Sequence, residues 1–317
     1  TFKPLIPLSI IIIPLFIGMF YGLITLIASL IKIKKNLSSI LIFSLIFAII
    51  EFIRGHVLGG FPWNLIVYSL TNYLYSIQIL SVIGTYSLNL LSITLFTLPV
   101  ILFFKQSIKL KLMGIFLILV IILFNNLYGY LNINKFNKTN KEKINYKIKI
   151  INPKITIDRF FNIDDSEPLI REVINLSKTK LNEKNLYIFP EGVFSHIYYS
   201  DLKYYREIFK KNFSDQDVII LGMNTQKIEN GKNKVFNSLI VVDNNLKLIS
   251  KYDKIKLVPF GEFLPFENFL SSFGLKKITE GYQSFSSSKS KRGVIELNLN
   301  NFNFLPLICY EIIYSGK

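Results

Sequence analysis

The sequence predicts a multi-pass α-helical membrane domain followed by an α/β domain. Half of the 317 residues are hydrophobic, and most of the excess lies in the first 131 residues. After Tyr130 the chain becomes polar and lysine-rich, and apolar runs then alternate with helical patterns. These observations predict a transmembrane helical domain at 1–131, a linker at 132–145 and an α/β domain at 146–317.

Four long apolar stretches fill the first domain. Each is long enough, or nearly so, to cross roughly 30 Å of hydrocarbon as a helix that rises about 1.5 Å per residue. The first stretch lacks a basic start and a small-residue cleavage site, so we expect a retained span rather than a signal peptide. The four stretches are Leu5–Ile31, Leu37–Ile53, Ile77–Phe104 and Leu112–Tyr130.

Lysines in two short loops predict how the spans are oriented, because such loops are held on the cytoplasmic side. The second domain is then expected on the outer side. The net charge of +16 comes from scattered lysines rather than a stripe. This pattern favours attraction to anionic lipid headgroups over nucleic-acid binding. The loop lysines are Lys32, Lys34 and Lys35 after the first stretch, and Lys105, Lys109 and Lys111 after the third.

The second domain shows strand-like runs separated by helical patterns, which is typical of a layered α/β fold. One helix is expected at 166–182, with Ser166 as its cap and Pro168 in its first turn, and another at 200–213. The strand-like runs lie at 146–152, 185–189, 217–228, 235–245, 246–260 and 303–311.

Cys309 is the only cysteine, so the chain contains no internal disulfide. A cysteine after an apolar run is usually a packing residue. This one, however, stands where the run gives way to polar Tyr310 and Glu311, and functional residues collect at strand ends in α/β sheets. A nucleophilic thiol would also need a base and donors for an oxyanion.

Two other segments offer such partners. Glu191 follows a predicted strand in a Pro–Glu–Gly turn. It is either a residue that only suits the turn or a carboxylate presented at the end of the strand. Lys254 and Lys256 alternate with apolar residues, as solvated lysines on an edge strand do. The loop that follows, 258–267, is rich in proline and phenylalanine and contains Glu262. Such a loop has a defined conformation, and loops with a defined conformation carry function.

Other chemistries lack their parts. His56 and His196 are far apart in the sequence and have no metal-ligand spacing, so we expect no metal and no cofactor. The sequence contains neither a Walker A loop nor a G-x-S-x-G elbow.

Together these segments resemble one family. The order of "FPEG", "YDKIKLVPFGE" and "CYE" resembles the Glu–Lys–Cys triad of the nitrilase, or carbon–nitrogen hydrolase, superfamily. Four sequence motifs are similar to those of the bacterial apolipoprotein N-acyltransferase family: "KIKLVPFGEFLP", "ICYEI" and "GLKKITEG" in the second half of the chain, and "EFIRGHVLGGFPWNLIVYS" in the membrane half. The resemblance covers most of the chain and implies a nitrilase-like αββα sandwich for the second domain.

The resemblance also implies roles for individual residues. Cys309 would be the nucleophile that carries an acyl thioester, and Glu191 the general base. Lys254 would stabilise the oxyanion, with help from the backbone N–H of Tyr310. Two further glutamates, Glu262 and Glu311, would support the site.

The reaction implied is acyl transfer from a phospholipid to the N-terminal amine of a diacylglyceryl-cysteine apolipoprotein, by a ping-pong scheme. The enzyme would lie in the bacterial inner membrane with its catalytic domain on the periplasmic side. Its partners would be these two substrates and the bilayer, with no nucleic acid and no cofactor.

The segment 148–162 departs from the family's Q-x-N-I-P-Q-x-x-K-W stretch and has no tryptophan. The family also has further spans and strands, so we expect the chain to be truncated at both ends. Two alternatives stay open. One is a membrane-anchored amidase that hydrolyses a small amide with the same triad, and the other is a non-catalytic membrane protein that binds lipid or a partner.

Overall fold

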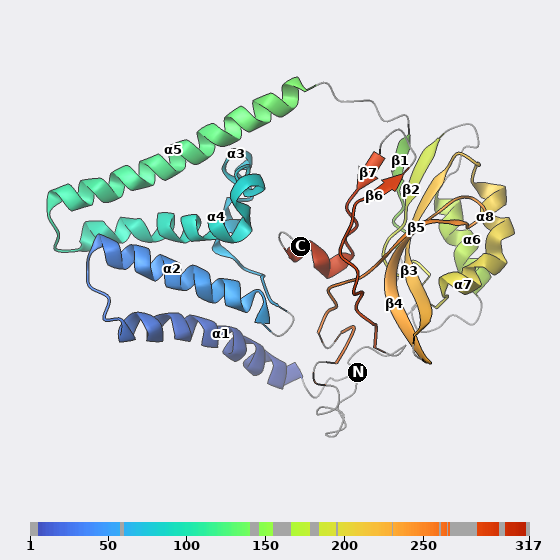
Figure 1. Ribbon diagram of the computed structural model, residues 1–317, viewed down its shortest axis with the longest axis horizontal. Coiled ribbons are helices and arrows are strands. Elements are labelled where there is room, and N and C mark those ends of the chain that lie inside the picture. The colour runs from blue at the N-terminus through green and yellow to red at the C-terminus, as the bar shows by residue number, and fades with distance from the viewer. Residues whose placement is uncertain are drawn as a thin grey trace. The chain divides into compact units, whose positions relative to one another are not determined.

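The computed structural model describes residues 6–57, 60–139, 146–154, 166–177, 184–194, 196–229, 231–259, 261–264, 266, 284–297 and 302–314. The chain divides into two compact units. The first contains Thr1–Lys141 and Ile313–Gly316, and the second contains Glu142–Ile312 and Lys317. Figure 1 labels the helices and strands of both units.

The first unit is helical. Four helices, or pairs of helices that run on from one another, are long and apolar enough to cross a membrane, which agrees with the four predicted spans. Between them lie the 3-10 turn η3 (Ile66–Leu70) and the short helix α3 (Leu74–Ile77). The long elements are α1 (Ile6–Leu30), α2 (Leu37–Arg54), α4 (Leu80–Thr97) continued by η4 (Leu98–Phe103), and α5 (Ile108–Lys138).

Helix α5 extends beyond the span predicted from hydropathy. It ends at Lys138, so residues 132–138 of the predicted linker are helical. The segment contains no glycine or proline to stop the helix. Its last turn carries Lys135 and Lys138, whose charges favour a helix C-terminus.

A polar network ties three helices of this unit together. Glu51 and Arg54 of α2 are 1% and 2% exposed, and they form an ion pair of 3.3 Å. Arg54 also donates to the Tyr21 hydroxyl of α1 at 2.7 Å and to the Trp63 carbonyl at 2.9 Å, while Asn89 of α4 donates to Glu51. Because each buried charge has a partner, these apolar helices can accommodate both.

The second unit is built on a five-stranded mixed sheet in the order β1-β2-β3-β4-β5. The first three strands are parallel to one another, and the last three form an antiparallel meander. A second sheet pairs β6 (Ile295–Leu297) with β7 (Phe302–Phe304). The strands of the large sheet are β1 (Lys147–Ile150), β2 (Asn185–Ile188), β3 (Val218–Glu229), β4 (Lys232–Val242) and β5 (Leu248–Asp253).

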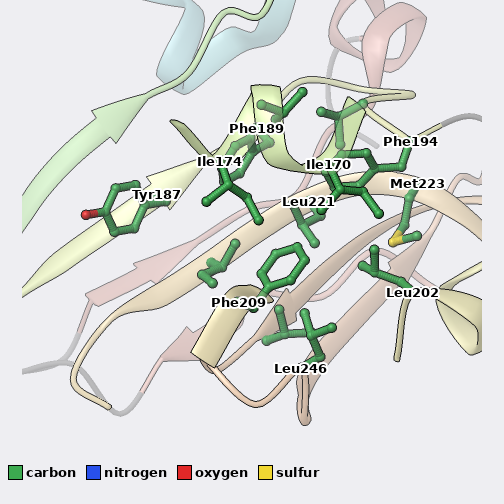
Figure 2. Packing of buried hydrophobic residues seen from close by; sticks show 14 of the residues in the cluster. Ile170, Ile174, Tyr187, Phe189, Phe194, Leu202, Phe209, Leu221, Met223 and Leu246 are labelled. Carbon is green, nitrogen blue, oxygen red and sulfur yellow. The ribbon is translucent and has the colours of Figure 1, made fainter. Parts of the chain in front are cut away.

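Helices α6 (Ser166–Leu176), α7 (Tyr199–Leu202) and α8 (Arg206–Asn212) lie along one face of the large sheet, and β6 and β7 lie along the other (Figure 1). On the helical face, Ile170 and Phe209 pack with Tyr187 and Leu221 (Figure 2). The alternate strand residues face the second sheet instead, in a cluster that includes Leu186, Ile220, Val241, Ile295 and Leu297. This layering, with the four long apolar helices of the first unit, confirms the predicted membrane domain followed by a layered α/β domain.

Several element boundaries differ from the predictions. The expected strand 246–260 ends at Asp253. In the expected run 303–311 the strand ends at Phe304, and Pro306, which has no N–H for a ladder, follows soon after. The predicted helix 200–213 is divided between α7, the 3-10 turn η6 (Lys203–Tyr205) and α8.

Some predictions fall on residues that are not described. Helix α6 begins at Ser166 and ends at Leu176, and both the residues before Ser166 and the predicted end at 178–182 lie outside the described part of the chain. The "GLKKITEG" segment and much of 148–162 also lie outside it.

Candidate active site

Glu191 lies in a turn pressed against strand β3. The backbone N–H of Phe189 donates to Ile220 at 2.9 Å, and that of Val193 donates to Gly222 at 3.2 Å. A side chain at Gly222 would place its Cβ 2.5 Å from the Glu191 Cα. The glycine therefore permits the close approach of backbone to backbone that presents Glu191 beside interior residues of β3 and β4.

Lys254 follows β5 directly and is buried, not solvated as on an edge strand. Its backbone N–H donates to the carbonyl of Asn237 on β4 at 2.9 Å, and its side chain is 1% exposed. The Nζ atom lies 2.9 Å from Oε1 of Glu262 and 3.3 Å from Oε1 of Glu191. Burial by itself lowers the pKa of Lys254, but Glu191, Glu262 and Cys309 together raise it above the usual value of 10.5. The ammonium group therefore stays charged.

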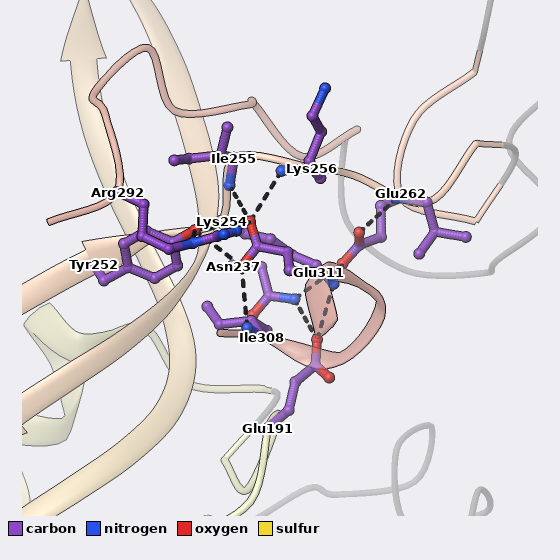
Figure 3. Close-up of polar contacts among 11 residues, drawn as sticks. Glu191, Asn237, Tyr252, Lys254, Ile255, Lys256, Glu262, Arg292, Ile308 and Glu311 are labelled. Carbon is purple, nitrogen blue, oxygen red and sulfur yellow. Dashed lines mark hydrogen bonds and ion pairs between the residues drawn. The ribbon is translucent and has the colours of Figure 1, made fainter. Parts of the chain in front are cut away.

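Asn237 is a site residue that the sequence analysis missed. Its Nδ2 donates to Oε1 of Glu191 at 2.6 Å and to Oε1 of Glu262 at 2.9 Å (Figure 3). The signal available in the sequence is the polar pair Asn237–Ser238, which interrupts the apolar run of β4. Glu262 is held in place by its own loop, because its Oε2 accepts from the backbone N–H of Val258 at 2.9 Å.

Glu311, expected to support the site, is completely buried and ties two segments together. Its carboxylate accepts from the segment after β5 and from the residue before Cys309. These hydrogen bonds lower the pKa of Glu311 below its usual value although burial opposes the shift. Its partners are the backbone N–H groups of Ile255, Lys256 and Ile308, the Tyr252 hydroxyl and, as an ion pair, Arg292.

Cys309 opens the 3-10 turn η7 (Cys309–Ile313) and does not lie on a strand. Its φ is 49°, in the left-handed region that residues other than glycine seldom occupy and that is common at functional sites. The residue as a whole is exposed, although its thiol is partly buried. It lies within hydrogen-bonding reach of Glu191, and the backbone N–H of Tyr310 donates to the sulfur.

Burial, and then the charge of Glu191, raise the pKa of Cys309 above the usual 9.0, although Lys254 and the Tyr310 N–H oppose them. The thiol is therefore mainly protonated near neutral pH. A thiol of this kind becomes a nucleophile when a neighbouring base takes its proton.

The structure thus brings together Glu191, Lys254 and Cys309, with the Tyr310 N–H at the sulfur and Glu262 behind the lysine. A nucleophile, a carboxylate and a charged donor in one place can perform acyl transfer or amide hydrolysis. Among the described residues, no group of three or more His, Cys, Asp or Glu side chains could hold a metal ion.

Comparisons with known proteins agree with this architecture. Residues 173–316 match the family model for carbon-nitrogen hydrolase, and residues 1–98 match that for the apolipoprotein N-acyltransferase N-terminal domain. An apolipoprotein N-acyltransferase from Rhodopseudomonas palustris is 28% identical over 100% of this chain and 60% of its own length. One from Brucella melitensis is 26% identical over 98% of this chain and 58% of its own.

Fold and site together define a carbon–nitrogen hydrolase domain joined to a helical membrane domain. The chain resembles the apolipoprotein N-acyltransferase family, by its match to the family's N-terminal domain and by its similarity to these relatives. It spans about 60% of the length of the curated relatives it matches.

Proposed function

We propose that this protein is an apolipoprotein N-acyltransferase. It takes a fatty acyl chain from a phospholipid onto Cys309 and passes it to the N-terminal amine of diacylglyceryl-cysteine lipoproteins. The observation that carries the proposal is the meeting of Glu191, Lys254 and Cys309. It occurs in a chain whose first part matches the N-terminal domain of this family and whose second part matches carbon-nitrogen hydrolase.

In the first half-reaction, Glu191 accepts the proton of the Cys309 thiol as the sulfur attacks the ester carbonyl carbon of the phospholipid. Lys254 and the backbone N–H of Tyr310 stabilise the tetrahedral oxyanion. When the oxyanion collapses, the C–O bond breaks and the lysophospholipid oxygen receives the proton from Glu191. One oxyanion donor of this kind is worth about 3–4 kcal/mol of barrier.

In the second half-reaction, the lipoprotein amine attacks the thioester carbonyl and loses a proton to Glu191. The C–S bond breaks, the thiolate recovers this proton, and the amide product leaves. Because the ion pairs hold Lys254 as an ammonium, it serves as an electrostatic donor rather than as the base. One thiol serves two bulky lipid substrates in turn, as the ping-pong scheme requires.

Exposed apolar residues that adjoin the site residues in the sequence support a lipid substrate. Four large hydrophobic residues within four positions of Cys309 or Glu262 are exposed. Exposed apolar surface at a site is typical of lipid or ligand binding. The four are Phe266 at 69%, Leu305 at 52%, Leu307 at 38% and Ile312 at 74%.

The proposal includes a location. We place the protein in the bacterial inner membrane with the second unit on the periplasmic side, because the loop lysines mark the cytoplasmic ends of the spans.

Acyl-enzyme formation tests the proposal. The protein is purified in detergent with phosphatidylethanolamine, and its intact mass is recorded before and after neutral hydroxylamine. We expect an added mass of one fatty acyl group that hydroxylamine removes and that Cys309→Ala lacks. Absence of this adduct, with Cys309→Ala still restoring lipoprotein acylation in cells that lack the enzyme, would remove Cys309 from the mechanism.

A further inference from the structure

We propose that Asn237 is a positioning residue that selects which oxygen of Glu191 takes the Cys309 proton. Its amide and the Lys254 ammonium occupy Oε1 of Glu191, which reserves Oε2 for the thiol. The inference rests on the proposed function and adds to it a residue with no role of its own in the triad.

The contacts form a closed ring of two donors and two acceptors. The Nδ2 atom of Asn237 lies 2.6 Å from Oε1 of Glu191 and 2.9 Å from Oε1 of Glu262. The Nζ atom of Lys254 contacts the same two oxygens at 3.3 Å and 2.9 Å. Figure 3 shows both contacts at a single oxygen of Glu191, and the other oxygen takes no part in the ring.

The ring is fixed from the side of Asn237. This residue is 6% exposed in the middle of β4, which pairs with both β3 and β5. Its carbonyl also accepts the backbone N–H of Lys254. Glu191, in contrast, is 36% exposed and extends from a turn. The buried strand residue therefore restrains the more exposed carboxylate.

The chemistry of an amide suits this place. An asparagine NH₂ group has two protons in one plane, and here each is directed at a different carboxylate. The ring already contains two carboxylates and one ammonium, so a neutral donor orients Glu191 without cancelling the charge that makes it a base. With Oε1 doubly occupied, the carboxylate plane is set and Oε2 becomes the proton acceptor. General-base catalysis depends on such geometry before it depends on basicity.

A purely structural amide would make a different prediction, because its loss would lower stability without changing the chemistry of Cys309. Asn244 provides the matched control. It is 3% exposed in the same unit, and its Nδ2 donates to the Phe213 carbonyl at 3.2 Å and to Oδ1 of Asp215 at 2.7 Å. Removing either amide deprives two oxygen acceptors of a donor, but of the two amides only Asn237 contacts Glu191.

The experiment compares Asn237→Ala and Asn244→Ala in the membrane protein, with Asn237→Ser as a milder variant that retains one donor. Three quantities are measured: the single-turnover rate of Cys309 acylation by phosphatidylethanolamine against lipid concentration, the alkylation of Cys309 by iodoacetamide against pH, and the Tm. Alkylation reports on the thiol whether or not acyl transfer occurs.

We expect Asn237→Ala to slow acylation about 100-fold, the scale of a catalytic group misplaced by about 1 Å, with an unchanged half-saturating lipid concentration. The pH profile of Cys309 alkylation in this variant moves to lower pH, because the carboxylate of a released Glu191 no longer lies beside the sulfur and no longer raises the thiol pKa. Asn237→Ser gives a smaller change in the same directions. Asn244→Ala keeps the wild-type rate and profile although its Tm falls.

Equal acylation rates and equal alkylation profiles for Asn237→Ala and Asn244→Ala would overturn the inference. If Asn237→Ala does not fold, the same equality between Asn237→Ser and Asn244→Ala would do so. A wild-type protein that forms no thioester would refute the proposed function, while a shifted alkylation profile in the Asn237 variants would still support the positioning role.

Discussion

Replacing Glu191 by glutamine is expected to change two properties of Cys309 in opposite directions. Glutamine keeps the shape of the side chain, and its carbonyl oxygen can still accept from Asn237 and Lys254, which now lie 2.6 Å and 3.3 Å from Oε1. The change removes only the negative charge and the capacity to accept a proton. Acylation of Cys309 should therefore fall while its alkylation rises.

The acylation loss follows from the role of a general base, which contributes about 10²–10⁴-fold in rate. The alkylation gain follows from the cause of the raised thiol pKa: burial comes first and the charge of Glu191 second. A unit charge about 4 Å away costs about 1 kcal/mol in a water-like dielectric and several times more in a protein interior. Because the Glu191 side chain is 36% exposed, we use the lower figure, which corresponds to about fivefold more thiolate below the pKa.

The sign of the second effect is the informative part. A group that raises the thiol pKa suppresses the thiolate, so its removal increases alkylation at any pH below that pKa. Intact mass after iodoacetamide treatment, sampled between about pH 7 and 9, measures the rate. Glu207→Gln, an exposed carboxylate on α8 in the same unit, serves as the control and should leave both rates unchanged.

Two results would refute the reasoning. If Glu191→Gln acylates at the wild-type rate, Glu191 is not the base. If acylation is lost but alkylation stays constant or slows, the carboxylate does not act on the thiol through its charge, and the loss has a structural origin.

Three further predictions concern the surroundings of the site and the membrane unit. Gly222→Ala inserts a Cβ 2.5 Å from the Glu191 Cα and should cost about 1–3 kcal/mol of stability and most of the acylation rate. Gly293→Ala, whose Cβ would meet nothing within 4 Å, should change neither quantity. Equal acylation rates in the two variants would contradict the close approach of Gly222 to Glu191. The pKa of Glu311 is lowered in the folded state, so the stability that this group contributes is present above the ordinary pKa of 4.5 and is lost as the pH falls through the folded pKa. The Tm of Glu311→Gln should therefore lie below that of the wild type by an amount that shrinks on acidification from pH 6 to 4. A constant difference in Tm would refute this. Arg54→Ala leaves the buried Glu51 without its ion-pair partner and should cost about 3–5 kcal/mol, seen as a lower Tm in detergent, whereas a wild-type Tm would show that the network does not stabilise the helices.

The sequence was sufficient where the signal is local. Apolar stretches of 17 to 28 residues define the four spans, because a helix needs about 20 residues to cross the bilayer. Glu191, Lys254 and Cys309 each stand beside an unusual local pattern, and the structure brings all three together. Their catalytic roles remain predictions until the acylation experiments are done.

What the sequence could not provide depends on strand register. Asn237 lies on β4, 46 residues after Glu191, whereas Lys254 follows the next strand, β5. Asn237 contacts both residues because β4 lies between β3 and β5 in the sheet. Alternation suggested that Lys254 faces solvent, but the chain leaves β5 at Asp253 and the lysine turns inward to two carboxylates. Arg292 forms an ion pair with Glu311 from a polar, serine-rich segment in which no local pattern marks it.

One experiment can follow the acyl group through both half-reactions of the proposed transfer. Protein loaded with a labelled acyl chain at Cys309 is freed of phospholipid and mixed with a diacylglyceryl-cysteine peptide, either with a free α-amine or with that amine acetylated. We expect rapid transfer of the label to the free-amine peptide, stoichiometric with its loss from Cys309, and no transfer to the acetylated peptide. Release of free fatty acid at the same rate with either peptide would contradict it and would assign the site to hydrolysis.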